Sequence, residues 1–238
     1  MGSTSSMKLI QIPFSHNCIK VRVALSVKGL PYEIENIRPM DRSMVKRISG
    51  QGLVPVLVDG EKAVADSTAI LLYLDERYPD PSLLPRDAKE RNLCLVLEDW
   101  ADRAFMEASR RIAYHTITST PGLVAGLFFP DERGFAVRVK ERIATRRVRQ
   151  RFHVSPERYP KDAASVRQAA ALALERLDGT GGSGWLLPQG PTVADIALAT
   201  MSAPLWTDPA LRAEPAIAKL LAWGERLLPA DVLRLYRR

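Results

Sequence analysis

The sequence predicts a two-domain protein in which an α/β sandwich is followed by an all-helical domain. Residues 7–79 alternate between strand-like and helix-like segments, whereas residues 88–238 show helical periodicity throughout. The stretch from Pro79 to Pro85 is rich in proline and has the composition of a linker. We therefore expect one domain over residues 7–79, a linker over 80–87 and an all-helical domain over 88–238.

The first domain is expected to begin with two parallel strands joined by a helix. Residues 8–12 and 30–37 are rich in branched residues, and the good helix formers between them end at Gly29, a suitable helix C′ residue. Asp59-Gly60 between two β-like runs predicts a hairpin. The expected order is strand 8–12, helix 19–28, strand 30–37, short helix 42–48, hairpin 52–64 and helix 69–78.

The second domain is expected to contain only helices. Apolar residues recur at helical spacing from residue 88 to about 117, and Pro121 breaks this pattern. Thr192 and Asp195 stand three residues apart before an apolar run, which is a variant of the capping box. The further helices are expected over residues 134–151, 161–177, 192–201 and 216–228.

Composition narrows the class of protein. The 238 residues are 46% hydrophobic and 26% charged, as in ordinary globular proteins, and no apolar run approaches the roughly 18 residues of a membrane span. Residues 1–6 lack the apolar core of a secretory signal and are interpreted as a disordered leader or tag. Two cysteines in dissimilar contexts indicate a reducing cytoplasm, and three scattered histidines give no metal-ligand spacing.

Ser15 is the first candidate for chemistry. It lies in a strand-to-helix turn, at or just before a helix N-terminus, where free backbone N–H groups and the helix dipole favour an anion. A hydroxyl there can hold a bound thiolate. The alternative is that Ser15 only caps the helix, because serine is common at that position.

Four short segments in order resemble the cytosolic glutathione S-transferase superfamily over residues 7–228. They are Ser15 through Leu25, Val54-Pro55, Asp66-Ser67 and Thr192-Val193-Ala194-Asp195. The resemblance implies a thioredoxin-like amino-terminal domain, an all-α carboxyl-terminal domain, glutathione as co-substrate, no metal cofactor, a homodimer and a role in detoxification. No class within the superfamily is assigned beyond the serine type.

The resemblance also implies roles for individual residues. Ser15 matches the serine that hydrogen-bonds the glutathione sulfur and stabilises its thiolate. Pro55 matches a cis-proline that turns the Val54 backbone toward glutathione. Asp66 and Ser67 match the pair that holds the γ-glutamyl end. The 192–195 segment matches a folding signature with no catalytic role.

The sequence departs from the family pattern where the glycine carboxylate of glutathione is bound. Leu53 stands where a basic or amide side chain is common. The substitute is left open among four residues, Gln51, Arg38, Arg42 and Lys46.

Three neighbours of Ser15 need separate interpretation. Cys18 stands at the second position of a Cys-x-x-Cys-like pattern whose first position is serine, so we expect a buried packing residue. Asn17 stands where a related disulfide-reductase branch has an asparagine near the thiol, and is a candidate for glutathione binding. His16 is expected to face solvent.

The second substrate leaves a weaker signal. An apolar wall is expected in the helical domain, although core packing explains its candidate residues at least as well. The basic run Arg138 to Arg158 is interpreted first as a solvated helix face. The functional alternatives are an anionic second substrate, an acidic partner protein or a membrane surface, and no nucleic-acid motif accompanies the run. The candidates for the wall are Tyr114, Phe128, Phe129 and Trp206.

The favoured function is a glutathione-dependent transferase whose thiolate attacks an electrophilic, apolar small molecule. A glutathione-dependent disulfide reductase using Ser15 and Asn17 is one alternative. A non-catalytic binding protein on the same fold is another, and Leu53 favours it slightly.

Overall fold

The amino-terminal part of the chain is a four-stranded sheet with helices on both faces. The computed structural model describes residues 7–236, and the predicted leader 1–6 lies outside the described residues. The strands lie in the order β2-β1-β3-β4; β1 and β2 are parallel, and the other two pairings are antiparallel. The strands are β1 (Met7–Gln11), β2 (Tyr32–Asn36), β3 (Val56–Asp59) and β4 (Lys62–Ala65).

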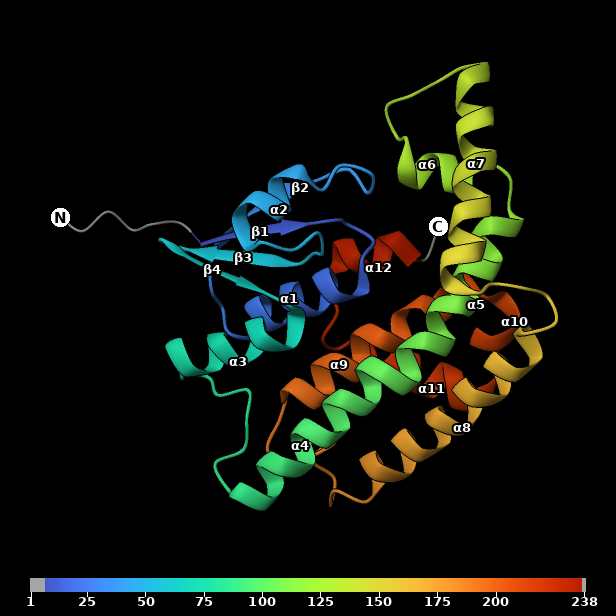
Figure 1. Cartoon of the computed structure of the whole chain (residues 1–238). Helices are drawn as coiled ribbons and strands as arrows, with labels where there is room; N and C mark the ends of the chain where they lie inside the picture. The colour runs from blue at the N-terminus through green and yellow to red at the C-terminus, as the bar shows by residue number, and fades with distance from the viewer. Residues whose placement is uncertain (1–6, 237–238) are drawn as a thin grey trace.

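Three helices complete this sandwich in the predicted order β-α-β-α-β-β-α. In Figure 1, α1 and α3 lie on one side of the sheet and α2 on the other. Branched residues of β1 and β3 are buried between these layers, since both faces of the central strands are covered. The helices are α1 (His16–Val27), α2 (Ser43–Ser49) and α3 (Ser67–Arg77).

The rest of the chain is helical, as predicted. The expected helix over residues 88–117 is three consecutive segments, because a π-helical turn, η1 (Ala101–Phe105), separates α4 (Ala88–Trp100) from α5 (Met106–Ser119). The later elements are α6 (Leu123–Phe128), α7 (Phe135–Phe152), α8 (Tyr159–Asp178), α9 (Val193–Ser202), the 3-10 helix η2 (Ala203–Thr207), α10 (Pro209–Arg212), α11 (Pro215–Gly224) and α12 (Ala230–Tyr236).

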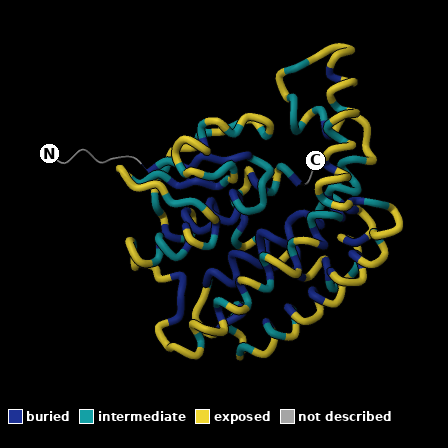
Figure 2. The backbone as a smooth tube through the Cα atoms, viewed as in Figure 1, coloured by how far each residue is buried: buried dark blue, intermediate teal, exposed yellow. Residues whose placement is uncertain are grey.

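Helix α9 is the centre of the packing. All of its residues are buried, and it packs against α1 of the sandwich as well as α4, α5 and α11 (Figure 2). Thr192 and Asp195 form the predicted capping box at its start. The buried Asp195 carboxylate accepts hydrogen bonds from the Thr192 N–H at 2.8 Å and the Leu186 N–H at 2.7 Å, so it fixes a loop as well as a helix.

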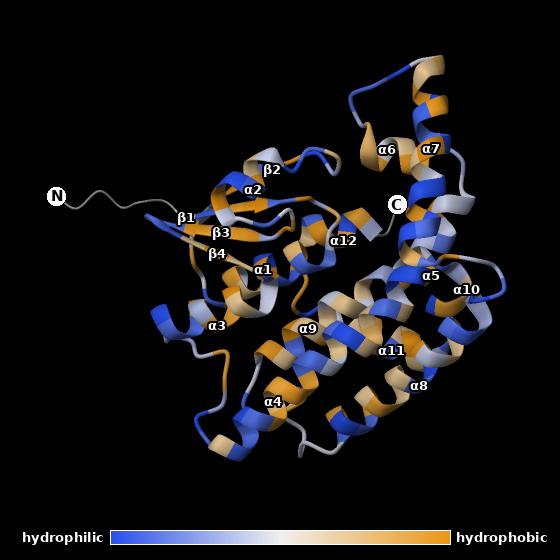
Figure 3. Cartoon of the chain, viewed as in Figure 1, coloured by the Kyte–Doolittle hydropathy of each residue, from blue (hydrophilic) through white to orange (hydrophobic). Residues whose placement is uncertain are grey.

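Helices α6 and α12 of the carboxyl-terminal half were not predicted, whereas α7 corresponds to the helix expected over residues 134–151. Short helix α12 lies against the sandwich, where Asp231 forms an ion pair with the buried Arg22 of α1. Helices α6 and α7 project beyond the helical core, and α7 presents alternating polar and apolar residues to its surroundings (Figures 1 and 3). Within residues 7–236, no helix is both long and apolar enough to cross a bilayer.

Candidate functional site

The sheet register brings three of the predicted site segments to one end of the sandwich. Val56 is paired with Ala65 on one side and with Ile10 on the other. The segment after β1, the segment before β3 and the segment after β4 must therefore leave the sheet at the same end. These segments carry Ser15, Val54-Pro55 and Asp66-Ser67, so residues distant in the sequence share one edge.

Ser15 is the residue immediately before α1. Its backbone is extended, and its carbonyl accepts the first helical hydrogen bond, from the Ile19 N–H at 2.9 Å. Its side chain makes no capping hydrogen bond, so capping does not account for the hydroxyl. Ser15 lines a cavity of about 390 Å³ between the sandwich and helices α5, α6 and α7. A hydroxyl and the start of a helix therefore face a space of ligand size.

Cys18 lies behind Ser15, one turn into α1. Its side chain is completely buried, and burial raises the pKa of its thiol to about 11, against the opposing effects of hydrogen bonds with the Ser15 side chain and the Ile12 backbone. The thiol is therefore protonated at neutral pH and is not a nucleophile. This placement agrees with the interpretation of Cys18 as a packing residue.

The sequence suggested that His16 faces solvent, and this expectation is wrong. It is partly buried and lines the cavity as the first residue of α1. Burial, together with the nearby Arg110 charge, lowers the pKa of His16 to about 3. The imidazole is therefore neutral in the physiological range and adds no positive charge to the site.

The peptide bond between Val54 and Pro55 is cis, as the resemblance implied. Val54 lines the cavity, whereas Pro55 is buried behind it. Asp66 has a left-handed φ of 79° and caps α3, where its carboxylate accepts a hydrogen bond from the Ala69 N–H at 3.1 Å. Ser67 is buried at the first position of that helix. Neither Asp66 nor Ser67 lines the 390 Å³ cavity itself.

The residues proposed around the glycine end of glutathione are not equivalent. Arg42 and Asn17 line the cavity together with the exposed Leu53. Gln51 does not line it; its N–H and carbonyl are instead engaged with the Ser49 hydroxyl. Arg42 also has a buried Nη1 atom with no hydrogen-bond partner in the described structure.

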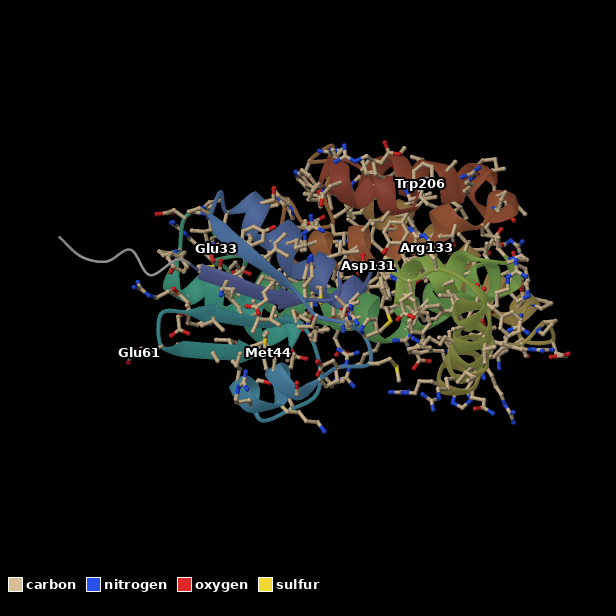
Figure 4. The ribbon with its side chains drawn as sticks, turned by 90° about the horizontal axis from the view of Figure 1, so that it is seen from above. Glu33, Met44, Glu61, Asp131, Arg133 and Trp206 are labelled. Atoms are coloured by element: carbon tan, nitrogen blue, oxygen red, sulfur yellow. The ribbon has the colours of Figure 1, made fainter. Side chains whose placement is uncertain are left out.

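The predicted apolar wall is placed only in part. Tyr114 and Phe128 line the cavity, and Phe129 lines a neighbouring space of about 540 Å³ that shares Phe128 with it. Trp206 lies on η2 among the late helices, away from both spaces (Figure 4). An apolar residue on a helix can face either core or cavity, and the sequence pattern alone does not separate the two.

The wall prediction contained no arginine, although the basic run Arg138 to Arg158 was considered for an anionic second substrate. Arg110 on α5 and both Arg147 and Arg151 on α7 line the cavity beside Arg42. Arg110 lies one turn before Tyr114 on one face of α5, and Arg147 lies one turn before Arg151 on α7. That spacing could have indicated from the sequence that each pair lies on one face of its helix. Within residues 7–236, no cluster of three His, Cys, Asp or Glu could hold a metal ion.

Comparison with known proteins supports the resemblance of the amino-terminal part to glutathione S-transferases. Residues 9–82 match the family model described as glutathione S-transferase, N-terminal domain. Over 76 residues the chain is 50% identical to glutathione S-transferase Z1 of Arabidopsis thaliana, covering 30% of this chain and 34% of that protein. The chain thus matches about a third of the length of this curated relative.

Solved structures extend the likeness to the whole fold. The β-etherase LigF of Sphingobium sp. strain SYK-6 has a TM-score of 0.70 at 21% identity, covering 97% of this chain and 98% of that one. A glutathione S-transferase from Methylobacterium radiotolerans, solved with glutathione sulfonate, has a TM-score of 0.63 at 23% identity, covering 97% and 94%. At these identities the likeness establishes the thioredoxin-like and helical architecture.

Proposed function

We propose that this chain is a glutathione-dependent transferase, because its residues 9–82 match the glutathione S-transferase N-terminal domain and its two-domain fold matches that of solved structures such as the β-etherase LigF. The glutathione thiolate attacks an electrophilic carbon of a small molecule. A carbon–sulfur bond forms. In a substitution, a leaving group departs with its bonding electrons; in an addition, the sulfur adds to one carbon of a double bond and the π electrons move to the rest of the electrophile. The proton of the thiol passes to solvent or to the adduct.

The observation that carries this proposal is the position of the Ser15 hydroxyl. It stands at the start of α1, on the wall of the cavity, and it does not cap the helix. A free thiol with a pKa near 8.5 is only a few per cent ionised at pH 7. A hydroxyl donor and the N-terminal end of a helix both favour the thiolate and lower that pKa.

The two ends of glutathione have matching groups at the same edge. Ser67 and the start of α3 fit the γ-glutamyl carboxylate, and Asp66 lies beside them for the amino group. Arg42 is the best candidate for the glycine carboxylate among the four basic and amide residues considered, because it lines the cavity and has an unpartnered buried nitrogen. We propose Asn17 and the Val54 backbone as further contacts; Gln51 lies outside the cavity wall.

The alternatives are weaker but separable. Disulfide reduction would use Ser15 and Asn17 without a reactive protein thiol, since Cys18 is buried. A non-catalytic binding protein does not require a Ser15 hydroxyl that faces a cavity and does not cap the helix. A homodimer, a cytoplasmic location and a role in detoxification complete the proposal and rest on the family resemblance.

Calorimetric titration with glutathione tests the proposal, with Ser15→Ala as the variant and Ser26→Ala, an exposed serine at the other end of α1, as the control. We expect all three proteins to bind glutathione similarly. The ultraviolet absorbance of the bound thiolate should vanish in Ser15→Ala alone, and conjugation should fall with it. Absence of glutathione binding to the wild-type protein at millimolar concentration would overturn the proposal.

A further inference from the structure

The cavity wall opposite the sandwich is strongly cationic. Arg110, Arg147 and Arg151 all line it, and no Asp or Glu among the described residues does. Three like charges facing one small space repel one another. Such an arrangement is stabilised when an anion occupies the space between them.

Arg110 is the most informative of the three. Its Nε atom is buried and has no hydrogen-bond partner in the described structure, and burial lowers the pKa of its guanidinium. The adjacent Arg111 shows the contrast, because it forms a bidentate ion pair with Asp162 and also binds Glu107. The nearby carboxylates are therefore engaged by Arg111, and Arg110 retains an unmet capacity to donate.

Aromatic rings hold Arg110 in place without neutralising it. Its guanidinium carbon lies 4.7 Å from the centroid of the Phe152 ring, and Arg151 approaches the same ring at 5.5 Å. Phe152 in turn stacks on Tyr114 at 4.7 Å. Two cations from different helices thus share one aromatic support, and this arrangement fixes their donors beside the cavity.

The arginines of the basic run on α7 differ in whether they line the cavity. Arg138, Arg142 and Arg146 are exposed and do not line the cavity, while Arg149 donates to Thr118. Arg147 and Arg151, one turn apart, are exposed as well, but they also line the cavity. Within residues 7–236 neither forms an ion pair. The solvated-face interpretation therefore holds for the run, and these two residues in addition present their charge to the cavity.

The remaining wall of the cavity is apolar and aromatic. Phe14 and Phe128 have ring centroids 5.6 Å apart, and both line the cavity near Ser15. Met106 adds a flexible apolar side chain from α5. A ligand with an aromatic or unsaturated body and an acidic group fits both parts of the wall.

We propose that the electrophile attacked by glutathione is an organic carboxylate with an apolar, aromatic or unsaturated body. Its carboxylate is bound by Arg110, with Arg147 and Arg151 adding charge, while its body packs on Phe14 and Phe128 and presents the reacting carbon toward Ser15. This inference rests on the proposed function for the reaction, but the anion site itself can be measured without catalysis.

The test compares 4-chloro-3-nitrobenzoate with its methyl ester, two probes that differ in the charged group. In each, the glutathione sulfur forms a bond to the ring carbon, the carbon–chlorine bond breaks, chloride leaves, and the thiol proton goes to solvent. Rates are divided by the uncatalysed rate of each probe, because the two rings differ in intrinsic reactivity. Binding of both probes without glutathione is measured by calorimetry in parallel.

The variants are Arg110→Met and Arg151→Met, with Arg110→Lys to retain charge. Arg146→Met is the control, because it removes one charge from α7 outside the cavity. The wild-type protein should favour the carboxylate about tenfold or more in binding and in corrected kcat/KM, as expected for a charge-assisted contact. Arg110→Met should lose most of this preference, Arg151→Met part of it, and Arg146→Met none.

Three results would overturn the inference. They are equal binding of the acid and the ester by the wild-type protein, an unchanged preference in Arg110→Met, or the same loss in Arg146→Met. Failure of the proposed transferase function looks different. In that case glutathione does not bind and neither probe is turned over, while calorimetry still reports whether the carboxylate is preferred.

Discussion

The Nζ atom of Lys20 on α1 lies 2.6 Å from Oδ2 of Asp102 in the π-helical turn. The same ammonium contacts the Glu98 carboxylate on α4 and lies 3.2 Å from the Thr68 hydroxyl on α3. The Lys20 side chain is fully buried, so the two carboxylates are its compensation for lost hydration. This cluster joins the α/β sandwich to the helical region at one point.

Removing the Lys20 ammonium should destabilise the protein strongly. Lys20→Met leaves Glu98 and Asp102 without their cation in a buried place, and we expect a loss of about 3 kcal/mol in the free energy of unfolding. Urea denaturation measures it. Lys8→Met is the control, because its partner Glu35 lies 3.3 Å away on a partly exposed surface and such pairs contribute less than about 1 kcal/mol. Equal losses would contradict the role assigned to the cluster.

His16 makes stability depend on pH. Burial, aided by Arg110, lowers its folded-state pKa to about 3, while an unfolded histidine has a pKa of about 6.5. Below pH 6.5 the unfolded chain takes up a proton that the folded chain excludes, so this contribution is complete above pH 6.5 and declines as the pH falls toward 3. Between pH 7.5 and 5.5 the wild-type protein should lose about 1 kcal/mol more than His16→Gln, as judged from urea midpoints. Parallel losses would show that His16 titrates normally in the folded state.

The cysteines should be unreactive in the folded protein. Cys18 and Cys94 are both fully buried, and burial raises the pKa of each thiol, to about 11 for Cys18. A chromogenic disulfide reagent at pH 7.5 should therefore detect almost no thiol in native protein, and both thiols in guanidinium. A fast-reacting thiol in the native protein that disappears in Cys18→Ala would contradict this prediction and show that Cys18 is reactive.

Arg42 should contribute to glutathione affinity more than its basic neighbours. A charge-assisted hydrogen bond to the glycine carboxylate is worth about 1.5 kcal/mol or more, so Arg42→Met should raise the calorimetric Kd of glutathione about tenfold. Lys46→Met is the matched control, since Lys46 lies on α2 one turn after Arg42 but does not line the cavity. If the Lys46 variant is weakened equally, general electrostatic attraction explains the effect.

The order of elements in the sandwich was predictable because each boundary has a local chemical cause. Gly29 ends α1 with a φ of 63°, and Asp59-Gly60 turns between β3 and β4. The consecutive residues Val56 and Leu57 of β3 are both buried, so alternation along this strand does not specify the register. The convergence of Ser15, Val54 and Asp66 was implied by the family resemblance rather than by local sequence signals.

The helical region was harder to predict where its elements are short. Helix α6 lies in a brief apolar stretch that contains Gly126, and α12 has only seven residues after Pro229. Short helices depend on tertiary packing more than on propensity, so their sequences carry little signal. The π-helical turn around Asp102 is likewise invisible to helical periodicity, which continues through it.

The cavity wall was predicted in part for a similar reason. Tyr114 and Trp206 are both aromatic residues on helical segments, yet only Tyr114 faces the cavity. Which side of a helix faces a ligand depends on how α5 and α7 are oriented against the sandwich, a long-range property. The basic run was recognised as a charge pattern, but the structure was needed to show that two of its exposed arginines, Arg147 and Arg151, also line the cavity.

The ion pair between Arg22 and Asp231 has a consequence for the order in which the molecule is completed during synthesis. The two residues are separated by 209 positions, and Arg22 is almost fully buried. While the ribosome is still translating the helical region, α1 has emerged but the partner of Arg22 has not. The sheet of the sandwich can therefore form early. The Arg22 guanidinium on α1 is covered and paired with Asp231 only when α12 has left the exit tunnel.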